Sequence, residues 1–448
     1  MLSKLKLKKL ILDYVYQINH KNLIYNKKEF YMNKTIKLAV VAALALGATS
    51  AFATNGSTMI GMGAKTRGMA GIGIGMGHGA ESTLSNPAFI ANIKNGTEIS
   101  FGGTLFMPDV ENANTVMTQN GAYTGPTASS DADTFVIPSV SIAHKVNDNF
   151  YVGIGMWGTG GLGVDYRDAS AAAGSTQMEM VTSLQLMQFG VPLVYKANNF
   201  SLGLTPIIQY GTLDINYFAD TNQNGTSTTH GAGIGSDISL GYNIGLAYET
   251  GGITLGAVYK SKIDMDYDGQ LEAAVGDMNG GQYSNNTLST PAEYGVGISY
   301  SASGHTIALD YKNIDWEGAE GYKDFGWESQ DVIIIGYQYA TDDWAVRIGY
   351  SDTDSAVQDN AGKGLPLDST IPVPPGGLTN TFNALGFPGN IETHYALGGT
   401  YNLSKTVSMD LAYVYAPEVT TSINNFMGQN ITTNHSETSY SFQVNLAF

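Results

Sequence analysis

Residues 436–448 read SETSYSFQVNLAF, and they carry the clearest structural signal in the chain. Tyr440, Phe442, Val444, Leu446 and Phe448 occupy alternate positions, and the positions between them are small or polar. Because successive side chains of a β-strand point to opposite faces, this segment predicts a strand with one apolar and one polar face. Lipid outside and a polar lumen inside produce this pattern in a membrane β-barrel. A sandwich strand also alternates, but it would seldom finish at the last residue with its aromatic face complete.

Similar alternating runs precede this segment along the chain. We predict fourteen strands, at about residues 97–108, 134–145, 149–158, 181–196, 199–218, 237–249, 252–268, 291–301, 304–316, 329–340, 343–354, 391–402, 405–416 and 436–448. Six tight turns alternate without exception with seven long loops; the turns are at 146–148, 197–198, 250–251, 302–303, 341–342 and 403–404. Such order indicates an even-stranded meander with short periplasmic turns, whereas a Greek-key sandwich would interrupt it. The predicted fold is therefore all-β, a 14-stranded antiparallel transmembrane barrel over residues 97–448.

Aromatic residues gather near the predicted strand ends. They include Trp157, Trp316, Trp327 and Trp344. Girdles at the two membrane interfaces would place aromatic rings there, and the ordinary strand preference for aromatic residues predicts the same positions.

A glycine-rich segment precedes the predicted barrel. Residues 55–95 read NGSTMIGMGAKTRGMAGIGIGMGHGAESTLSNPAFIANIKN. This much glycine disfavours an isolated helix or strand because it costs backbone entropy, yet the segment is too apolar for a solvated linker. We therefore expect residues 54–96 to form an N-terminal hatch that plugs the barrel lumen.

Composition agrees with a membrane barrel and excludes several classes of function. Charged residues make up 14% of the chain, against about 25% in typical soluble domains, and there are 27 tyrosines and no cysteine. The lack of cysteine excludes disulfides and thiol chemistry. The formal net charge of −17 argues against nucleic acid as a partner.

The N-terminus resembles an export signal. Residues 33–37 supply a positive region, residues 38–47 an apolar core, and Ala51-Phe52-Ala53 a small-residue cleavage site. We expect residues 1–53 to be a signal peptide that is cleaved after Ala53. Residues 1–31 lie upstream of Met32 and are expected to be an over-extended start.

Several motifs together resemble the FadL/TodX family of outer-membrane transporters of long-chain fatty acids and other hydrophobic compounds. Ser85-Asn86-Pro87-Ala88 matches the NPA motif of that family, and Gly160–Tyr166 (GGLGVDY) resembles the loop after its third strand. Residues 255–262, 291–316, 347–351 and 394–415 look like its later strands. The resemblance covers the chain from about residue 54 to residue 448.

This resemblance implies a function. It suggests passive uptake of hydrophobic small molecules across the outer membrane of a Gram-negative bacterium, gated by the hatch. It also suggests a kink in the third strand that opens a lateral exit into outer-membrane lipid, with Gly153, Gly155 and Gly158 as the candidate kink residues. We expect a monomer without a cofactor or metal. The alternative is a non-transport surface barrel, an adhesin or structural protein that acts through its long acidic loops.

Candidate contacts for a ligand follow from the strand alternation. The cations expected to face the lumen, where each could meet a ligand carboxylate or form an internal ion pair, are Arg347, Lys312, Lys260 and Lys262, with Arg67 in the hatch. Asp310 and Glu249 are also expected to point inward. The candidate apolar path is formed by Met59, Met62, Met69 and Met76, because methionine adapts to varied ligands, although these side chains could equally fill gaps against the wall.

Catalytic motifs are missing from the sequence. The run from Gly71 to Gly79 is GxGxGxGxG rather than GxGxxG, and no GK[ST] follows it. The seven histidines include no HExxH, and no Ser-His constellation has supporting context. We therefore expect a protein that is not an enzyme.

Overall fold

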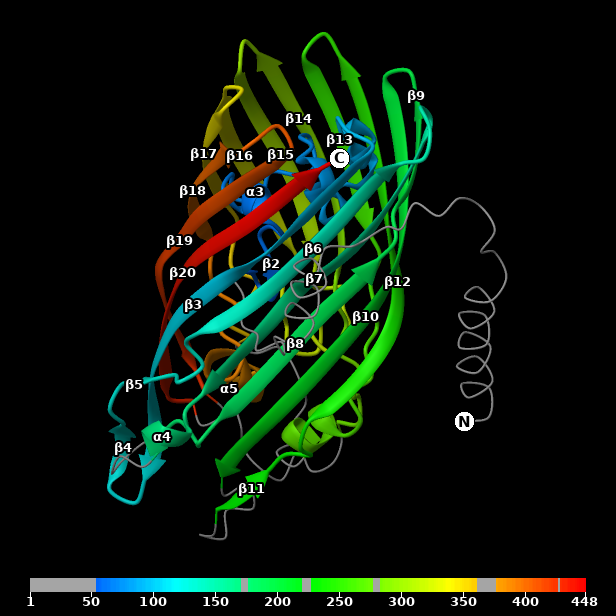
Figure 1. Ribbon diagram of the computed structural model, residues 1–448. Helices are drawn as coiled ribbons and strands as arrows, with labels where there is room; N and C mark the ends of the chain where they lie inside the picture. Colours follow the sequence, from blue (N-terminus) through cyan, green and yellow to red (C-terminus); the bar gives the residue numbers. More distant parts are fainter. Residues whose placement is uncertain (1–53, 171–175, 220–226, 277–282, 361–375, 426–427) are drawn as a thin grey trace, which may run out of the picture. The chain divides into compact units, whose positions relative to one another are not determined.

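The computed structural model describes residues 54–170, 176–219, 227–276, 283–360, 376–425 and 428–448. The predicted signal peptide, residues 1–53, lies outside these ranges. Within the described residues, fourteen wall strands pair with their neighbours in antiparallel order, and the last strand pairs with the first to close a barrel (Figure 1). Closure leaves no free sheet edge, which removes the unpaired backbone groups that an open sheet would expose to lipid. The predicted architecture is therefore confirmed.

The wall strands follow one another along the chain. Their bounds are β3 Thr97–Thr118, β6 Phe135–Lys145, β7 Phe150–Asp165, β8 Val181–Gly190 with β9 Leu193–Ala197, β10 Phe200–Ala219, β12 Gly235–Thr250, β13 Ile253–Lys260, β14 Ala292–Ala302, β15 His305–Asp315, β16 Gln330–Ala340, β17 Trp344–Asp352, β18 Thr393–Asn402, β19 Val407–Asn424 and β20 Asn430–Ala447. Their burial alternates, as in β10, because apolar side chains face outward and mostly small or polar side chains face the interior.

Several predicted strands differ in extent from the structure. The segment 181–196 is interrupted between β8 and β9, where Pro192 has no N–H to donate to a ladder. The segment 252–268 ends as a strand at Lys260, and beyond it only isolated bridges join Ile263 to Thr290 and Asp266 to Thr287. β3, β19 and β20 extend well past their predicted bounds on the long-loop side.

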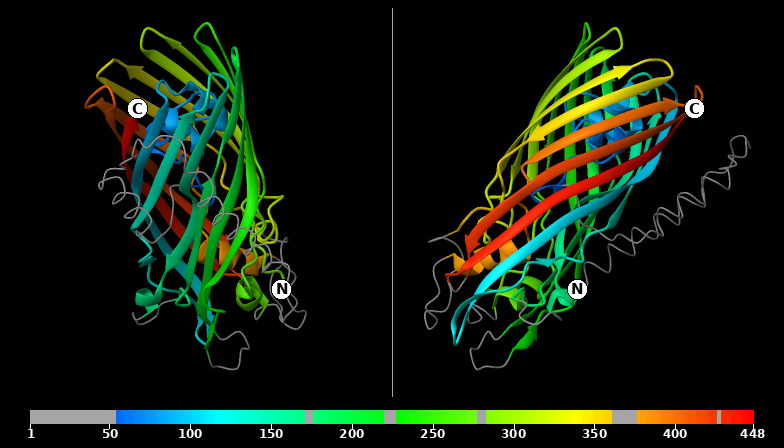
Figure 2. Two further views of the ribbon diagram at one scale, coloured as in Figure 1. Left: turned by 45° about the vertical axis from the view of Figure 1, so that its right-hand side comes forward. Right: turned by 90° about the vertical axis from the view of Figure 1, so that its left-hand side faces the viewer.

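The two ends of the barrel differ. All six predicted tight turns are present at one end, and at several of them the chain takes positive φ, as at Asn198 and Ser303. The other end carries the long loops with short elements of their own (Figures 1 and 2). These elements are β4 Gly121–Thr124, β5 Ala128–Ser129, α4 Arg167–Ser170, β11 Thr228–His230, η3 Glu272–Gly276 and α5 Gly377–Leu385.

Residues 54–96, the N-terminal segment, contain five short elements. These are β1 Thr54–Asn55, β2 Thr58–Met59, α3 Ala64–Arg67, η1 Gly79–Leu84 and η2 Pro87–Asn92. The segment is almost entirely buried, and its elements contact strands around the barrel, including β6, β7, β10, β12, β18, β19 and β20. In Figure 1 these elements, in blue, lie inside the ring of strands. Across the described residues no helix has the length and apolar character needed to cross a bilayer.

A girdle and an ordinary strand preference were both open for the four tryptophans, and the structure excludes three of them from a girdle. Trp157, Trp316 and Trp327 are buried inside the protein, and Trp344 is exposed on the outer surface. Many outward-facing tyrosines are exposed on the wall, including Tyr300, Tyr311, Tyr350 and Tyr401. An aromatic residue near a strand end can point either way, so its position along the strand does not by itself place it in a girdle.

Candidate functional site

The N-terminal segment lies against glycines of the inner wall. A methyl group placed on Gly256 of β13 would lie 1.7 Å from the carbonyl oxygen of Ile74, and one on Gly297 of β14 would lie 2.4 Å from the nitrogen of Gly75. A methyl group placed on Gly398 of β18 would likewise lie 2.7 Å from the Cα of Gly68. Backbone therefore meets backbone along this contact, and glycine is required on the wall for that approach.

A wall carboxylate holds the glycine-rich run. Asp310 on β15 is fully buried and accepts hydrogen bonds from the amides of Gly73, Ile74 and Gly75 at 2.8, 2.7 and 2.8 Å. Successive backbone N–H groups that converge on one anion form a nest, and bonds to an ionised acceptor are stronger than neutral ones. Asp310 thus fixes the middle of the N-terminal segment to the wall.

The NPA motif ties the segment to two further strands. Asn86 caps η2 because its Oδ1 accepts from the amide of Ala88 at 3.1 Å, and Pro87 occupies the first helical position. The Asn86 side-chain amide donates to the carbonyls of Ile74, Leu246 and Ala257 at 3.1, 3.1 and 3.3 Å. The motif therefore acts as a structural clamp between the segment, β12 and β13.

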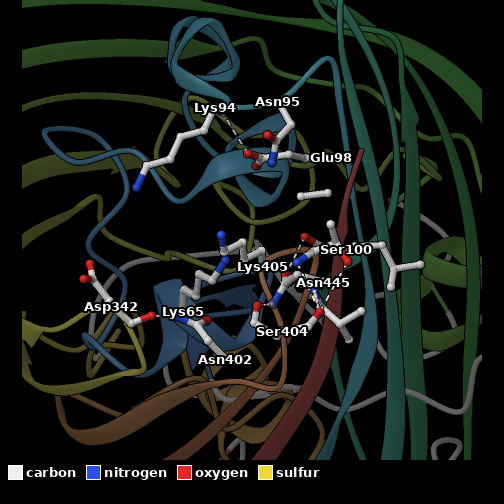
Figure 3. Close-up of a pocket in the computed structure, with 15 residues that line it drawn as sticks. Lys65, Lys94, Asn95, Glu98, Ser100, Asp342, Asn402, Ser404, Lys405 and Asn445 are labelled. Atoms are coloured by element: carbon white, nitrogen blue, oxygen red, sulfur yellow. Dashed lines mark hydrogen bonds between the residues drawn. The ribbon is translucent and has the colours of Figure 1, made fainter.

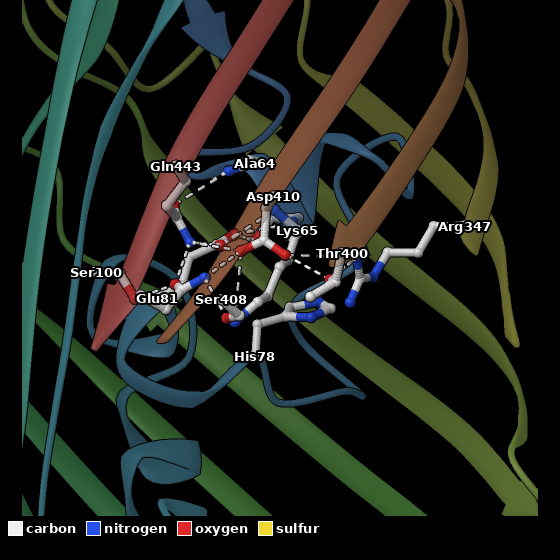
Figure 4. Close-up of polar contacts among 12 residues, drawn as sticks. Ala64, Lys65, His78, Glu81, Ser100, Arg347, Thr400, Ser408, Asp410 and Gln443 are labelled. Atoms are coloured by element: carbon white, nitrogen blue, oxygen red, sulfur yellow. Dashed lines mark hydrogen bonds and ion pairs between the residues drawn. The ribbon is translucent and has the colours of Figure 1, made fainter. Parts of the chain in front are cut away.

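A polar network joins the segment to β18, β19 and β20 (Figure 4). Glu81 is fully buried and accepts from the amides of Lys65 and Thr66 and from Gln443 Nε2, at 3.1, 2.7 and 3.0 Å. Asp410 on β19 is also fully buried, with Lys65 Nζ at 3.7 Å. Sequence analysis missed Glu81, Gln443 and Asp410 as contact residues; Gln443 and Asp410 occupy inward positions of their strands, which is the signal that could have found them.

Two predicted cations meet on one carboxylate inside the barrel, where β13 ends and β14 begins. Lys260 Nζ lies 2.7 Å from Glu293 Oε1, and Lys312 Nζ lies 3.5 Å from Glu293 Oε2. All three side chains line a small cavity of about 30 Å³ together with Met59 and Met62. A second cavity of about 30 Å³ shares Met62, Lys260 and Glu293. The structure thus brings two predicted cations and two predicted methionines together, along with Glu293, which sequence analysis missed.

The other predicted cations lie elsewhere and have protein partners. Arg347 is buried on β17, with Nε 2.7 Å from Gln338 Oε1 and Nη1 3.9 Å from Asp410. Arg67 is fully buried, and its Nη2 donates to Ser439 Oγ at 2.6 Å. Lys262 was predicted to face the lumen from a strand; this is wrong, because β13 ends at Lys260 and Lys262 pairs with Asp264 at 3.2 Å.

The remaining predicted methionines lie on different surfaces. Met69 is fully buried against Gly336 of β16 and Gly349 of β17, whereas Met76 is partly buried against the main apolar core. The structure therefore does not place the four methionines on one cavity.

An aromatic cluster from the long loops covers the start of the N-terminal segment. The rings of Trp316, Tyr322 and Trp327 lie 4.6–5.0 Å apart, centroid to centroid. A methyl group on Gly56 would lie 2.6 Å from Trp316, and the hydroxyls of Tyr322 and Ser57 are 2.9 Å apart. Ser57 therefore connects the loops to the segment.

Ser57 also contacts the third wall strand where its pairing changes. The β6–β7 ladder ends at Ser139 and Trp157, and the next residue on β6 is Pro138, which has no N–H. β7 then shifts register between Gly158 and Gly160. Beyond this point Gly161 donates its N–H to the carbonyl of Ser57 at 2.9 Å, and Thr58 pairs with Gly160.

A small apolar cluster lies near the place where β6 and β7 stop pairing, which we call the separation of β6 and β7. Met59, Phe106 and Ile137 are buried together, with Met62 and Phe135 packed against them. Of the candidate kink residues, Gly158 borders the register shift, whereas Gly153 and Gly155 lie in regular pairing with Ala143 and Ser141.

The described residues also contain no cluster of metal ligands. No group of three His, Asp or Glu side chains in the described ranges could hold a metal ion.

Comparisons with known proteins agree on one family. The family described as "Outer membrane protein transport protein (OMPP1/FadL/TodX)" matches residues 38–372. A FadL homologue of Pseudomonas aeruginosa has a similar structure, with a TM-score of 0.66 and 17% identity, covering 87% of this chain and 98% of that one. The toluene transporter TodX of P. putida gives a TM-score of 0.61 at 17% identity, covering 87% and 99% of the two chains.

One curated relative matches a shorter stretch. An uncharacterized protein from the 5′ region of the phosphoenolpyruvate carboxykinase gene of Chlorobium limicola is 37% identical over 97 residues, which is 21% of this chain. The match spans about half, 48%, of that relative's length.

Proposed function

Because the chain belongs to the outer-membrane transport family OMPP1/FadL/TodX, we propose that it is a passive channel for long-chain fatty acids or similar amphiphiles that carry a carboxylate. The barrel lies in the outer membrane of a Gram-negative bacterium, and its family consists of transport channels rather than enzymes. Transport here is facilitated diffusion, with residues 54–96 acting as the hatch.

The observation that carries this proposal is the cation cluster beside the methionines. Lys260 and Lys312 share the single carboxylate of Glu293, and nearby Asp310 is engaged by three backbone amides. Glu293 is thus shared between two ammonium groups, and the oxygens of Asp310 are occupied by backbone amides, which leaves donor capacity on the two lysines for a further acceptor. A ligand carboxylate would supply that acceptor, while Met59 and Met62 would contact the alkyl chain.

The proposed gate is the contact of Ser57 with both the loops and the wall. A ligand that enters among Trp316, Tyr322 and Trp327 would disturb the Tyr322–Ser57 hydrogen bond. Ser57 would then leave Gly161 and expose the edge of β7 that β6 does not cover. We propose this separation, bordered by Pro138 and Gly160, as the lateral exit into the membrane.

Uptake of labelled oleate and toluene tests the ligand assignment, in a host without a transporter of this kind. Lys312→Gln leaves the 2.7 Å Lys260–Glu293 pair in place and removes the second ammonium group. We expect oleate uptake to fall about tenfold, which corresponds to about 1.4 kcal/mol, and toluene uptake to stay unchanged. Lys323→Gln, in an exposed outer-loop ion pair with Glu320, is the matched control and should alter neither.

The outcomes separate the channel from its ligand. An equal fall in oleate and toluene uptake would contradict the carboxylate assignment and retain the channel. Uptake of neither compound by the intact protein, with the barrel folded in the outer membrane, would overturn the transport proposal and favour the surface-barrel alternative.

The gate is tested in the same assay by Tyr322→Phe. This change removes the hydroxyl that contacts Ser57 and keeps the ring packing, a loss of about 1 kcal/mol. Because the gate acts on every ligand, uptake of oleate and of toluene should rise together. Unchanged uptake of both would show that the Ser57 contact does not control passage.

A further inference from the structure

A third cavity lies apart from the cation cluster, at the short-turn end of the barrel (Figure 3). Its volume is about 480 Å³, and it is lined by Lys65 of the N-terminal segment, by Lys94 and Glu98 near the start of β3, and by the turn 404–406 between β18 and β19. Most of its lining is polar, unlike the apolar contacts around Met59 and Met62. An apolar ligand would therefore find little to bind in it.

Three ammonium groups converge on this cavity in a strongly acidic chain. The chain has 22 cationic residues against 39 acidic ones, and Lys65, Lys94 and Lys405 all line the cavity. Figure 3 shows the side chains of Lys65 and Lys405 directed toward the same part of it. Lys94 and Lys405 are exposed, and neither forms an ion pair with any residue of the described ranges.

Among the described residues, the two carboxylates on the cavity wall form no ion pair with Lys94 or Lys405. Glu98 accepts a hydrogen bond from the backbone amide of Lys94 at 3.1 Å. Asp342 lies on a separate turn, between β16 and β17. Ser404 and Thr406 add hydroxyl groups that can donate to an anion. Like charges directed into one space repel each other, and a bound oxyanion would relieve that repulsion.

We propose that this cavity is a binding site for an oxyanion, a phosphate or carboxylate group, held by Lys65, Lys94 and Lys405. The site does not depend on the transported ligand, because it shares none of the residues of the central cation cluster. Short turns of such barrels face the periplasm, so the site takes its anion from that side.

The site is coupled to the seating of the N-terminal segment through Lys65. The Lys65 ammonium lies 3.7 Å from Asp410, which also has Arg347 at 3.9 Å and bonds to Asn445. An anion in the cavity competes with Asp410 for Lys65. Anion binding and the polar seating of the segment are therefore linked, and each changes the free energy of the other.

Isothermal titration of the full-length protein in detergent with inorganic phosphate tests the site. We expect saturable binding that weakens at least tenfold in the double variant Lys94→Gln/Lys405→Gln. Both side chains are exposed and unpaired, so this variant should fold. Lys145→Gln is the matched control, because Lys145 also lies beside a short turn but pairs with Asp148 at 2.8 Å and is absent from the cavity lining.

A competition experiment identifies the source of the anion. Displacement of phosphate by octanoate, lost in the same double variant, would identify the site as one for carboxylate head groups. Phosphate binding without such displacement would identify a site for free phosphate. Identical isotherms for the intact protein and the double variant, or no saturable binding of either probe, would overturn the proposal.

Discussion

The N-terminal segment meets the wall in two chemically different ways. Along β13 to β15 its backbone lies directly on wall glycines, and Gly73 to Gly75 bind Asp310 through backbone amides. Along β19 and β20 it meets the wall mainly through side chains, in the network of Glu81, Lys65, Asp410 and Gln443. We call these the glycine contact and the side-chain contact.

The two contacts differ in how much rearrangement they tolerate. Backbone groups packed at van der Waals limits cannot rearrange without moving the chain, since protein interiors are close-packed. Side chains that share several partners can exchange them, as Lys65 can between Asp410 and the cavity. The glycine contact therefore anchors the segment, and the side-chain contact is where its seating can be adjusted.

The largest effect should come from Gly256→Ala in the glycine contact. Its new methyl group would overlap the carbonyl of Ile74, at 1.7 Å, and overpacking of this kind costs on the order of 3 kcal/mol. We expect the segment to be displaced, giving higher ion conductance in planar bilayers and faster proteolysis of residues 54–96. Gly399→Ala, whose nearest neighbour is 3.5 Å away, should behave like the unmodified protein. Unchanged conductance in Gly256→Ala would contradict a rigid anchor.

An intermediate effect is expected for Asp310→Asn. An asparagine keeps one acceptor oxygen and places an NH₂ group where three amides converge, so at least one charge-assisted bond is lost, at about 2 kcal/mol. Hydrogen exchange at Gly73, Ile74 and Gly75 should accelerate. Asp331→Asn, on the exposed face of β16, provides the control and should leave these amides protected. Equal protection of these amides from exchange in both variants would show that Asp310 does not anchor the segment.

The smallest effect should be the response of the side-chain contact to acid. Burial lowers the pKa of His78 to about 4, from about 6.5 in an unfolded chain, and its ring contacts the Ile72 carbonyl at 2.8 Å. The unfolded state binds more protons between these two values, so the stability that neutral His78 supplies is full above pH 6.5 and falls as pH is lowered toward 4.

Proteolysis of residues 54–96 measured from pH 7 to pH 5 checks this prediction. Cleavage should accelerate in the unmodified protein and stay nearly constant in His78→Gln, which cannot take up the proton. Protonation of His78 should destabilise the seating of the segment less than Gly256→Ala does. The segment should therefore stay inside the barrel from pH 7 to pH 5. An equal acid response in His78→Gln would assign the effect to other groups.

Much of the fold could be predicted because a barrel strand has to alternate. The lipid face of β20, from Tyr440 to Phe448, follows directly from that requirement, and the inward direction of Lys312, Arg347 and Asp310 follows from the same rule. Alternation gives the direction of a side chain but not its partner. It therefore could not pair Asp310 with the amides of residues 73–75, or Lys260 and Lys312 with Glu293.

The errors arose where the alternation ends. Lys262 was assigned by extending the pattern of β13 past Lys260, but the chain leaves the sheet there. For Trp316 and Trp327 a girdle and an ordinary strand preference were both open, and the structure packs them with Tyr322 over Gly56. Contacts between distant segments decide such positions. One sequence signal was available, because glycines recur at inward positions of several strands, such as Gly256, Gly297 and Gly398.

The pairing of the first wall strand with the last has a consequence for the order of folding. β3 and β20 close the barrel, and Thr54 donates its amide to Glu437 at 3.0 Å across 383 positions of sequence. Contacts of such long range carry a loop-closure cost and slow folding. Residues 54–96 emerge first, but Asp410, Glu437 and Gln443, which hold them, emerge last. Residues 54–96 therefore cannot acquire their final contacts until the end of the chain has been made.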